Sequence, residues 1–305
     1  MVLLLALMLP YMAAVLFGKS DGKKKQEVAA QENGNIVIMV EKTYGMEELP
    51  LEEYLVGSCA ASIPAEYEEE AIKAQAVILR SILYTTILQE KKDVKLKNNQ
   101  YHIEQEALNV NYLNPKERKK LWKSQEKEYE DKIRKAVRET AGLVIQEDYR
   151  TISPPYCRVS NGQTRDSDSF PFLRGVICEA DLCADSFADE KNYTKKQFIK
   201  ILEQNHFFLN QISDIRVKYD KSEYATMVYV GNQEISGEDF KKNFELASSS
   251  FHIDQYDGKI RIRTKGIGHG FGMSQYTANV MAKKGEDFLT ILHYFFQNID
   301  IEKIV

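Results

Sequence analysis

Alternation of apolar and polar residues predicts β-strands at several points along the chain. Residues 36–40 form a short apolar run, and residues 143–146 form another directly after a glycine. Residues 215–231 and 251–264 alternate apolar and polar side chains, which is typical of strands with one buried face. The segment 154–164 is predicted to begin in extended form.

Helical periodicity dominates between these strands. Residues 50–56 predict a short helix, followed by a turn around Ile63 and Pro64. The next segment predicts a largely buried amphipathic helix, and glutamates at 66–70 complement the positive N-terminal end of that helix. Its apolar face carries residues at helical spacing, namely Ala71, Ile72, Gln75, Ala76, Leu79, Ile82 and Leu83. Helices are also expected at 237–246 and 273–296, the latter broken near Gly285.

Residues 90–140 combine high charge with helical periodicity. The segment KERKKLWKSQEKEYEDKIRKAVRET alternates charge sign at helical spacing, which is typical of a solvated helix face. The pattern predicts a charged helical arm at about 90–140 that ends before Gly142. The whole chain therefore predicts an α+β fold with antiparallel strands, a buried amphipathic helix and this charged arm.

The N-terminal residues differ in composition from the rest. Residues 2–17 carry no charge, but the run is slightly shorter than the about 20 apolar residues of a spanning helix. We expect residues 1–18 to be a membrane anchor, with a cleaved signal peptide as the alternative. Residues 19–35 predict a polar linker, which leaves 36–305 as the folded domain. Lysines follow the apolar run and none precedes it, which by itself favours a cytoplasmic body.

Composition narrows the function classes. The chain has 305 residues, enough for one large domain or two small ones. Its 41 basic and 45 acidic residues give a net charge of −4, which argues against a nucleic-acid partner. Outside the membrane, its four cysteines permit disulfides, and Cys178 and Cys183 are close enough to close a small loop. The cysteine spacing fits no common zinc pattern, so no cofactor is expected.

Two ordered blocks carry a family resemblance. The first is LPLEEYLVGSCAASIPAEYEEEAIKAQAVILRS, from Leu49 to Ser81, and the second is GIGHGFGMSQYTANVMAKKGEDFLTILHYFF, from Gly266 to Phe296. Between them, PYCRVSNGQTR is a weaker match. Together they resemble the stage II sporulation protein D family, also called amidase enhancers, over about residues 45–300. Two long blocks in order are more specific than a lone short motif.

Charged residues of the first block share one helix face. Lys73, Arg80 and Tyr84 are spaced i, i+7 and i+11, which places them within about 20° of one another. A Lys or Arg on an otherwise apolar helix needs a partner if it is buried. A polymer rich in hydroxyls and carboxylates would supply one. The alternative is that both side chains extend to the surface.

Alternating glycines mark the second block. If the chain is extended from Gly266 to Gly272, one face lacks side chains and allows close approach of a backbone or a ligand. His269 lies in the middle and is the strongest candidate histidine, although it could simply hydrogen-bond a tight turn. Ser274, Gln275 and Tyr276 follow at the expected start of a helix, where Ser274 could be an N-cap.

The resemblance implies a catalytic acid that this chain lacks. Lytic transglycosylases of the family carry a glutamate in a V-A-x-E-M-P pattern, and alignment on Pro64 puts Ser62 at that position. The acid protonates the glycosidic oxygen and then accepts a proton from the 6-hydroxyl of the sugar, giving a 1,6-anhydro product. A serine hydroxyl is too weak an acid for this step. Glu66 and Glu68 lie beyond the Pro64 turn and are expected to be displaced.

The middle segment departs from the family pattern as well. Cys157 stands where many relatives have histidine, and Gln163 stands near a basic position of the family. Such departures indicate a site that has lost its original chemistry, or a subgroup with its own. Cys157 as a nucleophile or zinc ligand stays open, but cysteine is more often a small packed residue.

The resemblance implies a membrane-anchored protein whose body faces the cell wall and binds peptidoglycan glycan strands. In relatives a cell-wall amidase strips the stem peptides before the glycan is cut, during engulfment in sporulation. We expect a degenerate transglycosylase or amidase enhancer. Two alternatives stay open: an active lytic transglycosylase, and a structural partner of sporulation membrane proteins that uses the charged arm. The expected binding residues are Lys73, Arg80, Ser160, Gln163, His269, Ser274, Gln275 and Tyr276.

Overall fold

A computed structural model describes residues 36–42, 45–89, 95–97, 100–108, 110–207 and 214–304. The anchor and linker predicted for residues 1–35 lie outside these residues. No helix in the described ranges is long and apolar enough to cross a membrane. The predicted 36–305 domain consists of two compact units. The first runs to Pro154 and includes Met281–His293 and the residues from Asn298, and the second comprises Pro155–Val280 and Tyr294–Gln297.

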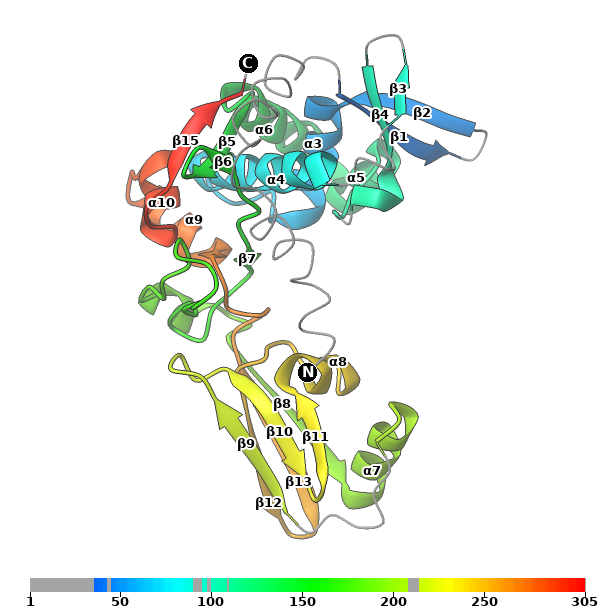
Figure 1. The fold of residues 1–305 in the computed structure, drawn as a ribbon, viewed down its shortest axis with the longest axis vertical. Coiled ribbons are helices and arrows are strands. Elements are labelled where there is room, and N and C mark those ends of the chain that lie inside the picture. The colour runs from blue at the N-terminus through cyan, green and yellow to red at the C-terminus, as the bar shows by residue number, and fades with distance from the viewer. Residues whose placement is uncertain are drawn as a thin grey trace. The chain divides into compact units, whose positions relative to one another are not determined.

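The first unit contains two sheets (Figure 1). One has the strand order β2-β1-β4-β3, in which β1 and β4 are parallel and the other pairs antiparallel. The other is antiparallel, with the order β15-β5-β6. These strands are β1 (Ile36–Lys42), β2 (Gly45–Pro50), β3 (Lys95–Lys97), β4 (Gln100–Glu104), β5 (Leu143–Glu147), β6 (Arg150–Thr151) and β15 (Asp300–Lys303).

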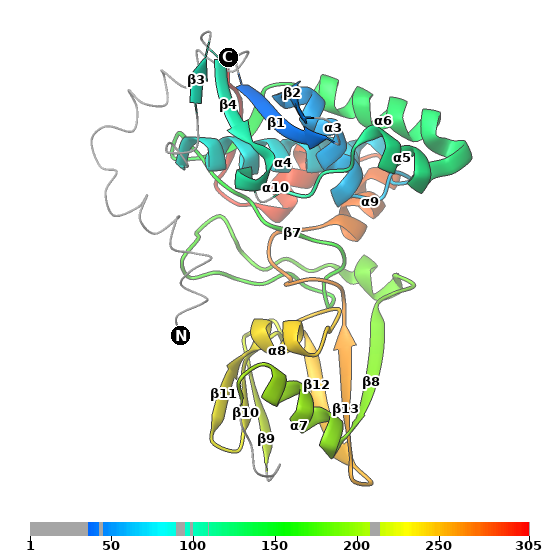
Figure 2. The same ribbon diagram turned by 90° about the vertical axis from the view of Figure 1, so that its right-hand side faces the viewer.

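Helices form the body of the first unit, and Figure 2 shows α3, α4 and α6 close together. Helix α4 is almost wholly buried from Ala71 to Thr85 and packs against α3, α6 and β5. The helices of this part of the chain are α3 (Leu51–Ser62), α4 (Glu69–Gln89), α5 (Pro115–Trp122) and α6 (Glu126–Glu139), joined by 3₁₀ turns at Gln105–Leu108 and Lys123–Gln125.

Local sequence explains where these helices begin and end. Pro50 precedes α3, and Glu52 and Glu53 occupy its first turn, where the helix dipole favours acidic groups. Helix α5 begins with a capping box. The Asn114 side chain accepts hydrogen bonds from two backbone N–H groups, and the Glu117 carboxylate accepts one from the Asn114 backbone N–H. Helix α6 ends at Glu139, and Gly142 adopts φ +76° before β5 begins.

The second unit contains two three-stranded antiparallel sheets, of order β11-β10-β9 and β12-β13-β8, and a short parallel pair, β7-β14. Helices α7 and α8 pack against strands of the larger sheets (Figure 2). The strands are β7 (Tyr156–Cys157), β8 (Ala188–Thr194), β9 (Ile215–Tyr219), β10 (Ala225–Val230), β11 (Gln233–Ser236), β12 (Phe251–Tyr256), β13 (Lys259–Lys265) and β14 (Met273–Ser274). The helices are α7 (Lys195–Gln204), α8 (Gly237–Asn243) and a 3₁₀ turn, η4 (Glu179–Cys183). Helices α9 (Gln275–Lys283) and α10 (Phe288–Phe295) follow in sequence.

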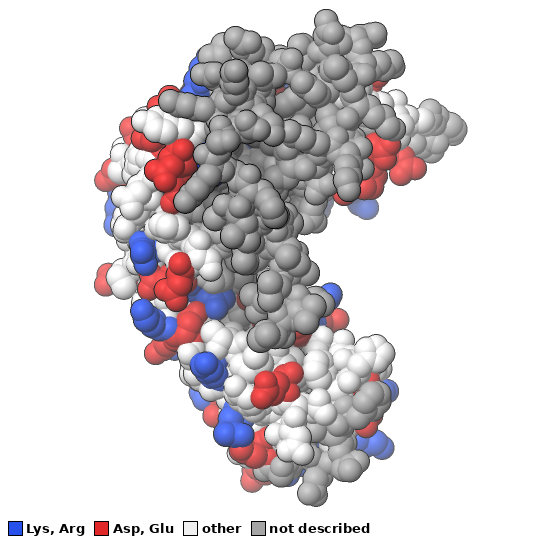
Figure 3. Space-filling view, viewed as in Figure 1, with Lys and Arg blue, Asp and Glu red and all other residues white. Residues whose placement is uncertain are grey.

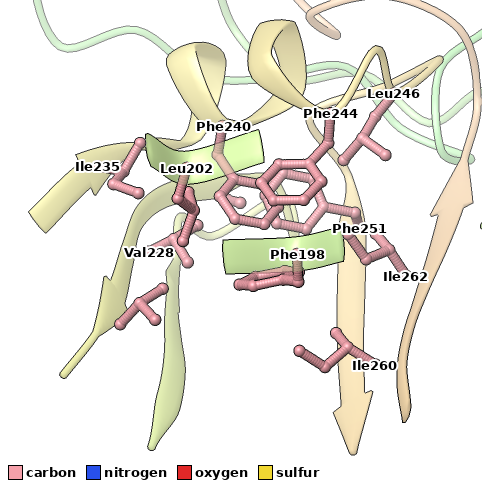
Figure 4. Packing of buried hydrophobic residues seen from close by; sticks show 12 residues of the cluster. Phe198, Leu202, Val228, Ile235, Phe240, Phe244, Leu246, Phe251, Ile260 and Ile262 are labelled. Carbon is pink, nitrogen blue, oxygen red and sulfur yellow. The ribbon is translucent and has the colours of Figure 1, made fainter. Parts of the chain in front are cut away.

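An aromatic core holds these strands and helices together (Figure 4). Phe240 stacks on Phe244 at 4.4 Å and on Phe251 at 5.1 Å between ring centroids. Phe198 of α7 packs on the same group, at 4.7 Å from Phe244. Ile260 of β13 completes the cluster. Since alternate residues of β13 point into this core, its other residues point away from it.

Most predicted elements of the body are present, and the α+β class is confirmed. The helix expected at 50–56 continues to Ser62. The expectation of helix throughout 90–140 is wrong for residues 95–97 and 100–104, which are strands, because β4 pairs with β1 and β3 pairs with β4. The helical arm is only partly solvated, because Ile133, Ala136 and Val137 of α6 are buried. Figure 3, which shows one face, has basic and acidic side chains interspersed.

Candidate functional site

Ser62 is the last residue of α3 and is half-buried. The chain leaves the helix at Ile63, whose extended backbone still donates its N–H to the Cys59 carbonyl at 3.0 Å. Pro64 continues the turn, because its ring disfavours a helical conformation in the preceding residue. Ser62 therefore lies at the C-terminal, partially negative end of the α3 dipole.

Carboxylates that follow the Pro64 turn are exposed or engaged in ion pairs. Glu66 and Glu68 are exposed. Glu69 pairs with Lys135 at 2.8 Å, and Glu70 pairs with Lys73 at 2.7 Å. The turn thus places exposed carboxylates on one side of Ser62 and an ion-pair cluster at the start of α4.

Lys73 lies at the centre of that cluster. Its ammonium group is 2.7 Å from Glu70, 2.7 Å from Glu139 of α6 and 3.2 Å from Glu69. Burial alone would lower the pKa of Lys73, but the hydrogen bonds to Glu139, Glu70 and Glu69 outweigh it and raise the pKa well above the usual range. Lys73 is permanently charged and joins α4 to the end of α6.

Arg80 is almost wholly buried, with 1% of its side chain exposed. Its guanidinium binds both carboxylate oxygens of Glu52 at 2.8 Å. It also donates to the carbonyls of Leu143 at 3.1 Å and Val137 at 3.2 Å and to Thr140 Oγ1 at 3.5 Å. Arg80 and Lys73 share one face of α4, as their spacing indicates, and both meet the C-terminal turn of α6, whose partial negative charge favours cations. Arg80 and Glu52 thus form a buried, bidentate ion pair that joins α4 to α3.

A small cavity borders this ion pair. It has a volume of about 150 Å³ and is lined by Ile36, Pro50, Leu51, Glu52, Arg80, Tyr84, Gly142 and Ile304. The volume is below the range of about 300–1,000 Å³ that is typical of ligand pockets.

The sequence analysis missed Asp181, which connects the middle segment to the second block. This carboxylate is fully buried. It accepts hydrogen bonds from the Ser160 backbone N–H at 2.6 Å, from Ser274 Oγ at 2.9 Å and from Thr277 Oγ1 at 2.7 Å. Ser160 and Ser274 are therefore brought together in the second unit, but by an internal carboxylate.

The alternating glycines make close backbone contacts in the second unit. Gly266, Gly268, Gly270 and Gly272 do not form a regular extended strand, because all four have positive φ, of 76°, 113°, 77° and 72° respectively. A Cβ on Gly272 would lie 1.9 Å from the Pro155 carbonyl oxygen, and one on Gly266 would lie 2.6 Å from that of Val159. A Cβ on Gly270 would lie 2.2 Å from the Tyr224 ring. The space left by the missing side chains is filled by the protein itself.

His269 is held in one tautomer by this turn. Its Nδ1 accepts the Phe271 backbone N–H at 3.0 Å, so the proton of the neutral ring is on Nε2. His269 is half-buried, and burial lowers its pKa to about 4, with Glu238 opposing the shift. Arg165 donates to the His269 carbonyl at 3.2 Å and lies over the Phe271 ring at 4.2 Å. His269 is thus a neutral donor whose Nε2 makes no hydrogen bond within the described ranges.

The other candidate residues of the second unit divide by exposure. Ser160, Ser274 and Gln275 are buried, and Ser274 also accepts from Thr277 N at 3.5 Å as the N-cap of α9. Gln163 is half-buried and pairs with Ile177 in an isolated bridge. Tyr276 is half-buried, and its hydroxyl donates to the Cys183 carbonyl at 3.4 Å. Among these predicted binding residues, the polar side chains that a ligand could reach are those of Gln163, His269 and Tyr276.

The cysteines are all free, so the possible disulfide between Cys178 and Cys183 is not formed in this structure. Cys178 is buried and Cys183 is exposed at the end of η4, so the 3₁₀ turn points the two side chains into different environments. Burial raises the pKa of Cys157 well above the usual value, and its Cβ lies 3.0 Å from the position of a Cβ on Gly268. These are features of a packed thiol. No group of three or more His, Cys, Asp or Glu residues suited to a metal ion occurs in the described part of the chain.

Comparison with known proteins gives the class of protein and then its family. The family model described as "Stage II sporulation protein" matches residues 40–146. Stage II sporulation protein D of Bacillus amyloliquefaciens is 27% identical over 265 residues, which cover 85% of this chain and 76% of that protein. Its Bacillus subtilis (strain 168) counterpart is 28% identical over 266 residues, with the same coverage. An uncharacterized protein of Brachyspira hyodysenteriae is 26% identical over 271 residues, 84% of this chain and 67% of that one. The chain is therefore similar to sporulation proteins as a class. Within that class it is similar to the stage II sporulation protein D family.

Proposed function

We propose that this protein binds peptide-stripped glycan strands of peptidoglycan and cuts them slowly or not at all. Its body would face the wall, outside a membrane that holds the N-terminal segment. The similarity to this family, and the presence of both of the sequence blocks that carry it, support peptidoglycan glycan as the ligand. The observation that carries the proposal is the hydroxyl of Ser62 at the half-buried end of α3, where lytic relatives have a carboxyl group.

The position of Ser62 suits an acid that the residue itself cannot provide. A carboxyl at the C-terminal end of α3 would be close to the negative end of the helix dipole, which raises its pKa. A raised pKa keeps part of the carboxyl protonated near neutral pH, as protonation of a glycosidic oxygen requires. A general acid typically contributes about 10²–10⁴-fold to the rate, so a serine here would remove most of the activity.

Neighbouring carboxylates are poorly disposed to substitute for this acid. Glu69 and Glu70 are bound to lysines, and Glu66 is exposed beyond the turn. Binding does not require an acid. It requires donors and acceptors that a sugar can reach, and His269 Nε2 is such a donor.

A binding measurement on His269 tests this proposal. The full chain in detergent is sedimented with sacculi that an amidase has stripped of peptides. His269→Asn keeps an acceptor for the Phe271 N–H, because an Asn side chain closes the same local turn, and it removes the Nε2 donor. His206→Asn, at an exposed position of the second unit, is the matched control.

We expect wild type and His206→Asn to sediment equally with the sacculi. His269→Asn should bind up to about tenfold more weakly, the effect of one hydrogen bond. Absence of wild-type binding would refute the proposed ligand. Equal binding by His269→Asn would remove His269 from the binding surface.

A further inference from the structure

Three lysines lie on one side of α5, and a fourth, Lys123, is the residue at which the helix ends. The three helical lysines follow the spacing i, i+3 and i+4, which defines one face of a helix, whereas Lys123 leaves the helical conformation with φ +51°. All four are exposed. The opposite face of α5 is buried through Arg118 and Trp122. This α5 lysine stripe consists of Lys116, Lys119, Lys120 and Lys123.

The stripe makes no ion pair within the described ranges. None of its four ammonium groups makes an ion pair or side-chain hydrogen bond there. Glu117 lies on the same helix, but its carboxylate accepts the Asn114 backbone N–H at 2.7 Å in the capping box. Helix α6 is arranged differently, because Lys127 pairs with Asp131 at 2.8 Å and Arg134 pairs with Glu130 at 2.8 Å.

Part of this arrangement opposes the stability of α5. Like charges four residues apart on a helix repel each other, and α5 contains one such pair, Lys116 and Lys120. Lys116 also lies near the positive N-terminal end of the helix, where the dipole disfavours a cation. An ordinary solvated face would alternate its charges as α6 does. The chain as a whole has a net charge of −4, so a basic composition does not explain the stripe.

We propose that the α5 lysine stripe docks on an anionic phospholipid surface. The proposal rests on the membrane location in the proposed function and is independent of glycan chemistry. Each lysine held near an anionic membrane contributes about 1 kcal/mol, or a factor of about five in partitioning. Four lysines together would contribute several hundred-fold at low salt, and the contribution would fall as salt screens the charges.

The chemistry of the stripe favours lipid over two other anionic partners. An anionic polymer is usually held in a groove with aromatic side chains, whereas this face is a helix surface that carries only lysines. A protein partner would need a buried apolar or aromatic centre, with charges at the rim. Lysine is a flexible point charge without the fork geometry of arginine, which suits a plane of headgroup phosphates.

Lysine footprinting of the full chain tests the proposal. The protein is mixed with vesicles of phosphatidylcholine alone or with added phosphatidylglycerol, and flotation confirms that it is bound. Accessible lysines are then acetylated briefly, and mass spectrometry reads the reactivity at each position. Lys195 and Lys196 of α7, which are exposed, are internal controls. A parallel sample contains soluble poly(glycerol phosphate) in place of vesicles.

The expected result is protection of the stripe by at least fivefold on the anionic vesicles, lost on neutral vesicles and at high salt, with the controls unchanged. A stripe that reacts equally on both vesicles while the protein floats would overturn the proposal, as would failure to float on anionic vesicles. Protection by the soluble polymer alone would overturn it in favour of a wall polymer. Glycan binding is measured separately, so the failure of one proposal is not mistaken for that of the other.

A matched pair of variants adds an independent readout. One carries glutamine at all four stripe positions, and the other carries glutamine at four exposed lysines elsewhere, with the same change in net charge. The stripe variant should lose the preference for anionic vesicles, and the control should keep it. Equal loss in both would show that net charge alone is responsible and would overturn the assignment. The control positions are Lys195, Lys196, Lys283 and Lys284.

Discussion

Replacing Arg80 by methionine removes five hydrogen bonds and the cation that neutralises Glu52. Methionine fills much of the arginine volume, so the cost comes mainly from groups left unpaired. Breaking a buried ion pair typically costs about 3–5 kcal/mol. Glu52 has 41% of its side chain exposed and can be rehydrated, so we expect the lower end, about 3 kcal/mol. In a unit of this size that corresponds to about 6–12 °C in melting temperature.

The protein offers a local probe for this measurement. Trp122 is the single tryptophan, and it is buried in the first unit, where Arg80 also lies. Urea titration followed by its fluorescence therefore reports the free energy of unfolding of that unit. Lys127→Met is the control, because Lys127 is 91% exposed and its pair with Asp131 should be worth less than about 1 kcal/mol.

The same variants test whether Arg80 has a structural role or binds the glycan. If our reasoning holds, Arg80→Met shifts the unfolding midpoint strongly, and the glycan affinity of the fraction that remains folded is unchanged. An unaltered midpoint together with lost glycan binding would refute the structural role.

Three further predictions follow from the second unit. Asp181→Ala should destabilise that unit by about 3 kcal/mol, because three buried donors lose their acceptor, whereas an exposed Asp185→Ala should have little effect in the same thermal scan. The pKa of His269 is lowered from 6.5 to about 4 in the folded protein. As the pH falls, the unfolded state therefore binds a proton at a higher pH than the folded state does. Stability should then fall between about pH 6.5 and 4 by up to about 3 kcal/mol, and His269→Asn should flatten that part of the profile in pH-dependent urea titrations. Cys183 is exposed and the other three thiols are buried, so a thiol reagent should label one cysteine rapidly in the folded protein and all four in urea.

Local sequence patterns were sufficient to predict many of the strands and helices. Period-two alternation identified β12 and β13, and helical spacing identified α4, because each pattern reflects one buried face. Strands β3 and β4 escaped prediction because both are short and largely polar, and because β4 pairs with β1, which is about 60 residues earlier in the chain, while β3 pairs with β4. Strand structure there is imposed by a tertiary contact that no local window contains.

The candidate site shows the same limit. The spacing of Lys73 and Arg80 correctly indicated one shared face and the need for partners, but the sequence could not show that Glu52 and Glu139 are those partners. Asp181 gave no signal, because it is a short polar residue in the brief 3₁₀ turn η4 and its acceptor role depends on three donors from distant segments. The alternating glycines indicated close approach, and only the structure identifies Pro155–Ser160 and Tyr224 as the groups that approach.

Digestion of peptide-stripped glycan strands tests the central claim most directly. Wild type, Ser62→Glu and Ser62→Gln are compared, because glutamine matches glutamate in size and lacks the acid. Mass spectrometry counts the 1,6-anhydro ends. Our account predicts little or no product from wild type or Ser62→Gln and a clear gain from Ser62→Glu. Anhydro ends formed by wild type at a rate equal to that of Ser62→Glu would contradict it and would require a different catalytic acid.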